Sequence, residues 1–159
     1  MTAVKEVNDE AERISVKGSY EFFGDSLINL KFESKSAYMD GILKESEASF
    51  SFNDGMPLIT ITHLIEGSYA LERSWNNVIE PLLQSELYGT DLLYFEAPGK
   101  IEKVYDIYNG FQMNVEKEDD LSYVVILGGK RHRFQYQNGI LSQFTNSFGV
   151  YTITFRLVK

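Results

Sequence analysis

The residues best suited to chemistry in this 159-residue chain are its two histidines, His63 and His132. Histidine titrates near neutral pH and is often a general base or a metal ligand. We expect His63 to be a partly buried core residue and His132, within the basic run 130–133, to be exposed. No HxxxH, HExxH or His–Asp–Ser spacing accompanies them. The sequence therefore predicts no catalytic residue, no metal and no cofactor.

Acidic residues are plentiful, with 23 Asp and Glu against 15 Lys and Arg and a net charge of −8. The densest groups are Glu45 with Glu47 and the acidic run 118–120. We expect the first pair to lie on an exposed strand face and the second group in a solvated loop. An acidic protein is repelled by the phosphates of a duplex, so nucleic acid is not an expected partner. The absence of cysteine excludes disulfides and thiolate chemistry.

Short segments in which apolar and polar residues alternate indicate a mainly β protein. In the segment 56–65, the face of Ile59, Ile61, His63 and Ile65 is the more apolar, and we expect it to point inward. Asn109-Gly110 and Asn138-Gly139 have the composition of type I′ hairpin turns. The predicted strands cover residues 13–23, 26–34, 42–52, 56–65, 67–74, 101–108, 111–117, 121–128, 131–137, 140–145 and 150–158.

One segment departs from this pattern and predicts a short helix. In residues 77–87 the apolar side chains recur at helical spacing, and Asn77 with Glu80 resembles a capping box. A second, weaker helical pattern covers residues 4–13. We therefore predict a single domain over residues 1–159, in which a strongly curved antiparallel sheet or incomplete β-barrel carries the short helix on its concave face.

Aromatic residues are abundant, with 11 Phe, 10 Tyr and one Trp. They could simply fill the core of a β protein, or they could line a cavity for an apolar ligand. The aliphatic–aromatic run Leu92–Phe95, between a Gly-Thr-Asp turn and Pro98-Gly99, could be core, a lid over such a cavity, or an apolar surface that meets a ligand. The residues that we expect at such a cavity are Phe50, Phe52, Trp75, Leu82, Leu92, Leu93, Tyr94 and Phe95.

The segment LYGTDLLYFE and its surroundings resemble the LolA-like family of periplasmic lipoprotein-sorting proteins. Gly89, Thr90 and Asp91 match the turn of that family and Tyr94 its aromatic position, whereas Leu93 and Phe95 replace residues that are often small and polar or acidic. The resemblance covers residues 56–158. It implies an incomplete barrel whose apolar cavity accepts acyl chains. It also implies a place in the cell envelope.

Three functions are compatible with these observations, and we expect the first. It is the non-enzymatic binding of a lipid or lipoprotein acyl chain. The second is a module that binds a protein partner through an exposed edge strand or a sheet face. The third is a small barrel enzyme, such as a cyclase or isomerase, acting through His63 or Tyr105. No apolar run approaches the ~20 residues that span a bilayer. The polar N-terminus lacks the character of a signal peptide. The expected location is therefore the periplasm after removal of a leader, or otherwise the cytoplasm.

Overall fold

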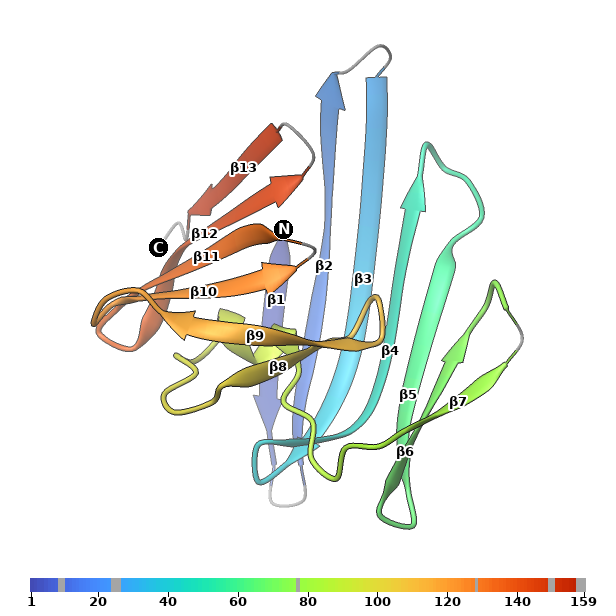
Figure 1. Cartoon of the computed structure of the whole chain (residues 1–159). Helices are drawn as coiled ribbons and strands as arrows, with labels where there is room; N and C mark the ends of the chain where they lie inside the picture. Colours follow the sequence, from blue (N-terminus) through green and yellow to red (C-terminus); the bar gives the residue numbers. More distant parts are fainter. Residues whose placement is uncertain (9–10, 24–26, 77, 128, 149–150, 157–159) are drawn as a thin grey trace. The chain divides into compact units, whose positions relative to one another are not determined.

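The computed structural model describes residues 1–8, 11–23, 27–76, 78–127, 129–148 and 151–156. The chain is mainly β and forms two compact units. The first unit comprises Met1–Tyr88 with Ile107–Gly110, and the second comprises Gly89–Asp106 with Phe111–Lys159 (Figure 1). The prediction that residues 1–159 form one domain stays a prediction.

The first unit is an antiparallel sheet of seven strands that follow one another in chain order. In this order β1 and β7 are the edge strands, so the described sheet is open and does not close into a barrel. The predicted strong curvature stays a prediction. The strands are β1 (Thr2–Val7), β2 (Glu12–Phe23), β3 (Leu27–Met39), β4 (Ile42–Phe52), β5 (Leu58–Ile65), β6 (Ser68–Arg73) and β7 (Ile79–Leu82).

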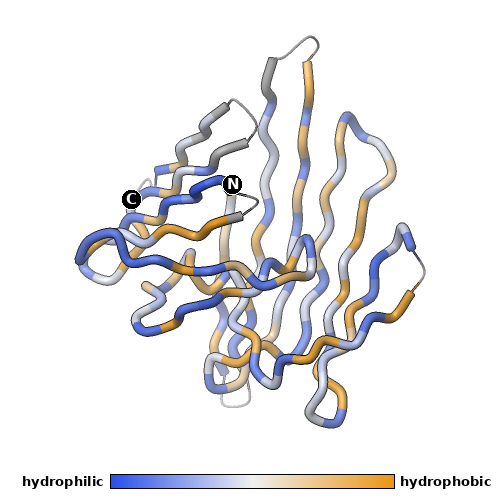
Figure 2. Tube along the Cα trace, viewed as in Figure 1, coloured by the Kyte–Doolittle hydropathy of each residue, from blue (hydrophilic) through white to orange (hydrophobic). Residues whose placement is uncertain are grey.

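The second unit is an antiparallel sheet of six strands, again paired in chain order, and preceded by the 3₁₀ helix η1 (Thr90–Tyr94). Its strands are β8 (Lys103–Asp106), β9 (Phe111–Lys117), β10 (Ser122–Leu127), β11 (Lys130–Gln137), β12 (Ile140–Phe148) and β13 (Tyr151–Arg156). The acidic run 118–120 lies in the β9–β10 connection, which is hydrophilic in Figure 2. This placement agrees with the predicted solvated loop.

The helix predicted over residues 77–87 is wrong, because Ile79–Leu82 forms strand β7. This strand lies at the sheet edge, where Pro81 can be accommodated without the loss of a ladder hydrogen bond. The apolar residues that suggested a helical stripe have separate environments: Leu83 is 98% exposed and Leu87 is fully buried. The proposed N-cap, Asn77, lies outside the described residues. The helical pattern over residues 4–13 is also wrong, because β1 and β2 occupy most of that segment.

Backbone angles confirm one of the two predicted type I′ turns. Asn138 and Gly139 both have positive φ, at 54° and 76°. At the other turn only Gly110 has positive φ, at 75°, so Asn109-Gly110 does not form a type I′ turn. Residues 107–110 instead make a wider turn that packs within the first unit. A Cβ atom on Gly110 would lie 2.6 Å from a methyl carbon of Leu71, so this close packing requires glycine.

Candidate functional site

A strip of small hydroxyl residues crosses three central strands of the first unit. It consists of Ser34 and Ser36 on β3, Ser46 on β4, and Thr60 and Thr62 on β5, and we call it the hydroxyl strip. The register places Ser36 opposite Ser46 and Ser46 opposite Thr62, so these side chains share one face. All five residues are at most 5% exposed. We call the face that carries them the inner face of the sheet.

The three serines of the strip have unsatisfied hydroxyl groups. Among the residues that the structure describes, none of their Oγ atoms has a hydrogen-bond partner. A buried hydroxyl without a partner costs about 1–3 kcal/mol of stability. Folding could avoid this cost if alanine stood at these positions. The strip is therefore a polar feature that stability alone does not explain.

A turn within the first unit covers part of the hydroxyl strip. Thr60 Oγ1 donates a hydrogen bond of 2.6 Å to the backbone oxygen of Tyr108, and the ring of Tyr108 meets Phe32 edge-on at 6.3 Å. Arg73 donates a hydrogen bond of 3.2 Å to the backbone oxygen of Asn109. The turn 107–110 therefore lies against the inner face of β5 and β6.

Beside the hydroxyl strip, the inner face becomes aromatic. Tyr20, Phe32, Phe50 and Phe52 occupy adjacent register positions on β2, β3 and β4, and we call them the aromatic patch. Tyr20 and Phe32 lie 6.2 Å apart, and Phe50 and Phe52 lie 5.8 Å apart in an edge-on arrangement. Three of these residues are half-buried, and Phe52 is 41% exposed. The patch is therefore more accessible than the strip.

On the other side of the hydroxyl strip, large residues close the inner face. Tyr38, Leu43 and Tyr69 are each at most 1% exposed. The Tyr69 hydroxyl donates a hydrogen bond of 2.6 Å to the backbone oxygen of Leu43, and the backbone N–H of Leu43 bonds to the backbone oxygen of Leu87. Burial raises the pKa of the Tyr69 hydroxyl. This end of the face is a satisfied, packed core.

Two of the eight sequence-predicted site residues, Phe50 and Phe52, belong to the aromatic patch. Leu82 lies on the inner face of β7, opposite Tyr69, and is half-buried. Trp75 is 47% exposed in the turn that follows β6, with the Arg73 guanidinium 5.9 Å from the centre of its ring. The first unit therefore brings Phe50 and Phe52 together but places Leu82 and Trp75 elsewhere.

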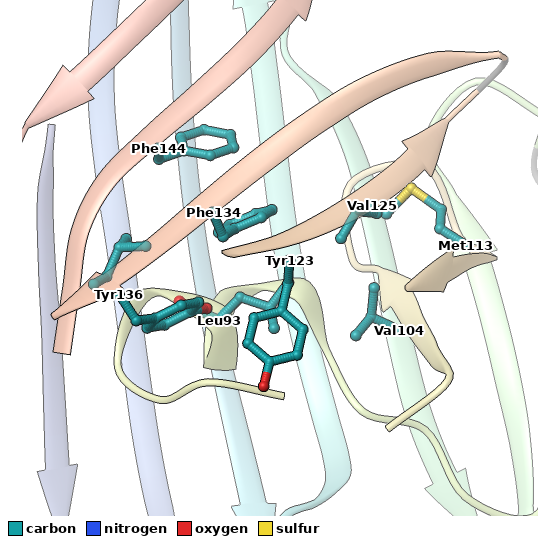
Figure 3. Close-up of a cluster of buried hydrophobic side chains, with 9 residues drawn as sticks. Leu93, Val104, Met113, Tyr123, Val125, Phe134, Tyr136 and Phe144 are labelled. Atoms are coloured by element: carbon teal, nitrogen blue, oxygen red, sulfur yellow. The ribbon is translucent and has the colours of Figure 1, made fainter. Parts of the chain in front are cut away.

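The other four predicted site residues, Leu92 to Phe95, belong to the second unit. Leu92 and Leu93 lie in η1 and are 4% and 2% exposed, while Tyr94 and Phe95 are half-buried. Leu93 packs in the core of this unit, where the Tyr136 hydroxyl donates a hydrogen bond of 2.7 Å to its backbone oxygen (Figure 3). Within the second unit Leu93 is therefore core rather than rim.

Stacked rings continue this core across the second unit. Phe134 and Phe144 stack with centroids 4.6 Å apart, and Phe155 stacks on Phe144 at 5.9 Å. The ring centroid of Tyr94 lies 6.3 Å from that of Phe134 and 5.8 Å from that of Phe144. Burial strongly raises the pKa of the Tyr136 hydroxyl, which agrees with an internal structural role. These aromatic residues stabilise the second unit.

The two histidines occupy positions that the sequence did not predict. His63 lies on the outer face of β5, opposite Glu45, because the fully buried face of that strand carries Thr60 and Thr62. The predicted inward direction of Ile59, Ile61 and Ile65 is therefore wrong. His132 is half-buried rather than exposed. It lies opposite Val125, which belongs to the core.

Burial lowers the pKa of His132. The side chain of Asn146 and the charge of Asp106 oppose this effect, and Lys130 adds to it. Asp106 is itself only 5% exposed. The half-buried environment of His132 thus lowers its pKa, whereas the sequence predicted an exposed residue at this position.

The predicted carboxylate groups lie in solvent. Glu45 and Glu47 are exposed on the outer face of β4. Of the acidic run, Glu118 Oε2 lies 2.8 Å from Arg133 Nε in an ion pair, and Asp119 lies 3.5 Å from the same guanidinium. The backbone N–H of Leu121 lowers the pKa of Asp119. These contacts are exposed ion pairs of the kind that keeps a sheet surface charged.

No protein-family model, curated protein or solved structure matches this chain. Within the described residues, no group of three or more His, Asp or Glu side chains could hold a metal ion. The described part of the chain also contains no helix with the length and apolar character needed to cross a membrane. The LolA-like resemblance stays a prediction.

Proposed function

We propose that the protein binds an amphipathic lipid without chemical conversion, on the inner face of its first unit. The apolar body of the lipid lies across the aromatic patch, and its polar end accepts and donates hydrogen bonds at the hydroxyl strip. The observation that carries this proposal is the group of three buried serine hydroxyls that have no partner among the described residues, directly beside partly exposed aromatic rings. Ligand sites commonly combine apolar walls with a few polar groups in this way.

The geometry of the strands supports a ligand that spans both features. Phe32 and Ser34 point to the same face of β3, and Phe50, Ala48 and Ser46 do so on β4. A spacing of about 6.6–6.8 Å between residues i and i+2 places the serines within reach of a chain that lies over the rings. The turn 107–110 covers Thr60, so ligand entry requires this turn to move from the face.

The proposed occupant is an acyl chain, as the LolA-like resemblance implies. In this proposal the open sheet of the first unit curves around the acyl chain of the ligand as an incomplete barrel. The protein is located in the periplasm. Neither His63 nor the exposed carboxylates take part in chemistry. Binding therefore depends on shape, apolar contact and hydrogen bonds alone.

Native mass spectrometry of the purified protein, followed by organic extraction, tests this proposal first. A co-purifying lipid, or uptake of a pyrene-labelled monoacylglycerol, is the expected result. Ser46→Ala should weaken uptake several-fold because it removes a hydroxyl of the strip. The matched control is Ser49→Ala on the outer face of the same strand, opposite Glu33, which should bind like the wild type. An apo mass with no uptake of the labelled lipid would overturn the proposal.

A second function, the binding of a protein partner, is favoured by one observation at the edge strand β7. Trp75, Val78, Ile79 and Leu83 are between 47% and 98% exposed in and beside this strand. An edge strand with apolar neighbours can pair with a strand of another chain. Sedimentation over a range of protein concentrations tests this function in its self-associating form. A sedimentation coefficient that stays that of a monomer, and that Leu83→Lys does not change, would exclude self-association through this edge.

A further inference from the structure

On the described strands of the first unit, the charged residues of the inner face occur as pairs. By register, the charged residues on this face of the described strands are Lys5 and Glu12 at one side, and Arg73 and Glu80 at the other. Lys5 Nζ lies 2.8 Å from Glu12, and Arg73 Nη1 lies 2.6 Å from Glu80. Each cation is therefore neutralised by a carboxylate on its own face.

These ion pairs flank the hydroxyl strip rather than enter it. Lys5 is opposite Ile14, which is opposite Ser36, so two strand spacings of about 4.8 Å separate the lysine from the strip. Arg73 is opposite Thr60, and it is held by Glu80 and by the backbone oxygen of Asn109. The Arg73 hydrogen bond lowers the pKa of Glu80, so this carboxylate stays ionised at neutral pH. Neither cation is available to a ligand without the loss of its present partner.

The hydroxyl strip itself offers only uncharged donors and acceptors. A serine hydroxyl can donate one hydrogen bond and accept others, which suits an alcohol, an ester or an amide. A carboxylate or phosphate placed there would lose its hydration without gaining an opposite charge, and such desolvation is far more costly for an ion than for a neutral polar group. The strip and its flanking pairs therefore favour an uncharged ligand head.

We propose that the site selects lipids with an uncharged, hydrogen-bonding head over ionised lipids of the same chain length. This inference rests on the proposed lipid-binding function and specifies its ligand class. In this scheme Glu80 and Glu12 determine specificity, because each holds one cation, Arg73 or Lys5, in an ion pair. Arg73 and Lys5 are positioning residues.

Competitive displacement of the pyrene-labelled monoacylglycerol at pH 8 tests the inference. The competitors share one acyl length: monohexadecanoylglycerol, hexadecanol, methyl hexadecanoate and ionised hexadecanoate, all below their aggregation concentrations. We expect the three neutral lipids to compete at least about tenfold better than the acid, because only the acid carries a charge into the strip. Equal or better competition by the acid would overturn the inference while leaving lipid binding intact. Failure of the labelled lipid to bind would overturn the proposed function itself.

A pair of variants separates charge selection from simple chain fit. Glu80→Gln removes the carboxylate that occupies Arg73, so the affinity for hexadecanoate should rise several-fold while the affinity for hexadecanol stays unchanged. The matched control is Glu72→Gln, since Glu72 lies on the outer face opposite Ile61 and should alter neither affinity. Thermal unfolding of both variants shows whether they are folded. If folded Glu80→Gln protein binds the acid no better than the wild type, the assigned role of Glu80 is wrong.

Discussion

The unsatisfied serines allow a prediction in which stability and binding change in opposite directions. Ser36 and Ser46 lie opposite each other, are 5% and 3% exposed, and have no hydrogen-bond partner among the described residues. Alanine at each position keeps the Cβ atom and removes only the hydroxyl. We expect Ser36→Ala and Ser46→Ala each to raise the free energy of unfolding by about 1 kcal/mol, the lower end of the cost of an unsatisfied buried hydroxyl.

The double variant should be more stable by about 2 kcal/mol, less any coupling between the neighbouring sites. For a chain of this length, that corresponds to an increase of about 4–8 °C in Tm. Urea and thermal unfolding followed by circular dichroism measure both quantities. Ser49→Ala on the outer face is the matched control and should change stability by less than about 0.5 kcal/mol. The same double variant should bind the labelled monoacylglycerol more weakly than the wild type.

A loss of stability of about 1 kcal/mol in each serine variant would refute this reasoning. It would mean that the hydroxyls make hydrogen bonds in solution, for example with buried water, and are part of the structural core. A stabilised double variant with unchanged lipid affinity would support the stability argument but contradict the proposed role of the hydroxyls in binding. The hydroxyls would then be costly, as we infer, but the ligand head would bind elsewhere.

Three further predictions concern the core, the covering turn and pH. Tyr136→Phe removes the hydrogen bond to the Leu93 backbone oxygen and should destabilise the protein by about 1–3 kcal/mol in urea unfolding; an unchanged midpoint would contradict the importance of this bond. Gly110→Ala should destabilise by about 1–3 kcal/mol, because φ is 75° and the new Cβ atom would meet Leu71 at 2.6 Å; Gly139→Ala, with positive φ but open space, should cost less. Burial lowers the pKa of His132, so the imidazole binds a proton more readily in the unfolded chain than in the folded protein. The stability that comes from burying the neutral imidazole is therefore complete above the unfolded pKa of about 6.5, and it is lost as pH falls below that value. His132→Gln should flatten the decline of Tm with acidification in that window, and an unchanged decline would show that other groups cause it.

The strand pattern could be predicted from sequence because alternation and turn composition report local structure. Asn138 and Gly139 both have positive φ, as their composition indicates. The segment 77–87 failed for a physical reason. Its apolar residues satisfy a helical period, but Ile79–Leu82 gains ladder hydrogen bonds with β6 at the sheet edge, and local propensity does not report such tertiary pairing.

The candidate site was only partly predictable. Aromatic content pointed to Phe50 and Phe52, which do lie in the aromatic patch. We also predicted Leu93 at the rim of an apolar cavity, but Leu93 packs in the core of the second unit. The sequence contains no signal that separates an apolar residue in a packed core from one at a ligand site. That distinction depends on which other strands supply neighbours.

The face of β5 that is buried explains why the sequence did not predict the hydroxyl strip. Alternation assigns the more apolar face of a strand to the interior, and here that rule placed Ile59 and Ile61 inside. The structure instead buries Thr60, which is opposite Ala48 of β4, and Thr62, which is opposite Ser46. The three serines of the strip, on β3 and β4, have no hydrogen-bond partner among the described residues, a cost in stability that alanine would avoid. On β3 and β4, by contrast, the opposite face carries charged residues such as Lys35 and Glu47, so alternation there places the serines inside, and β5 is the strand of the three that departs from the rule.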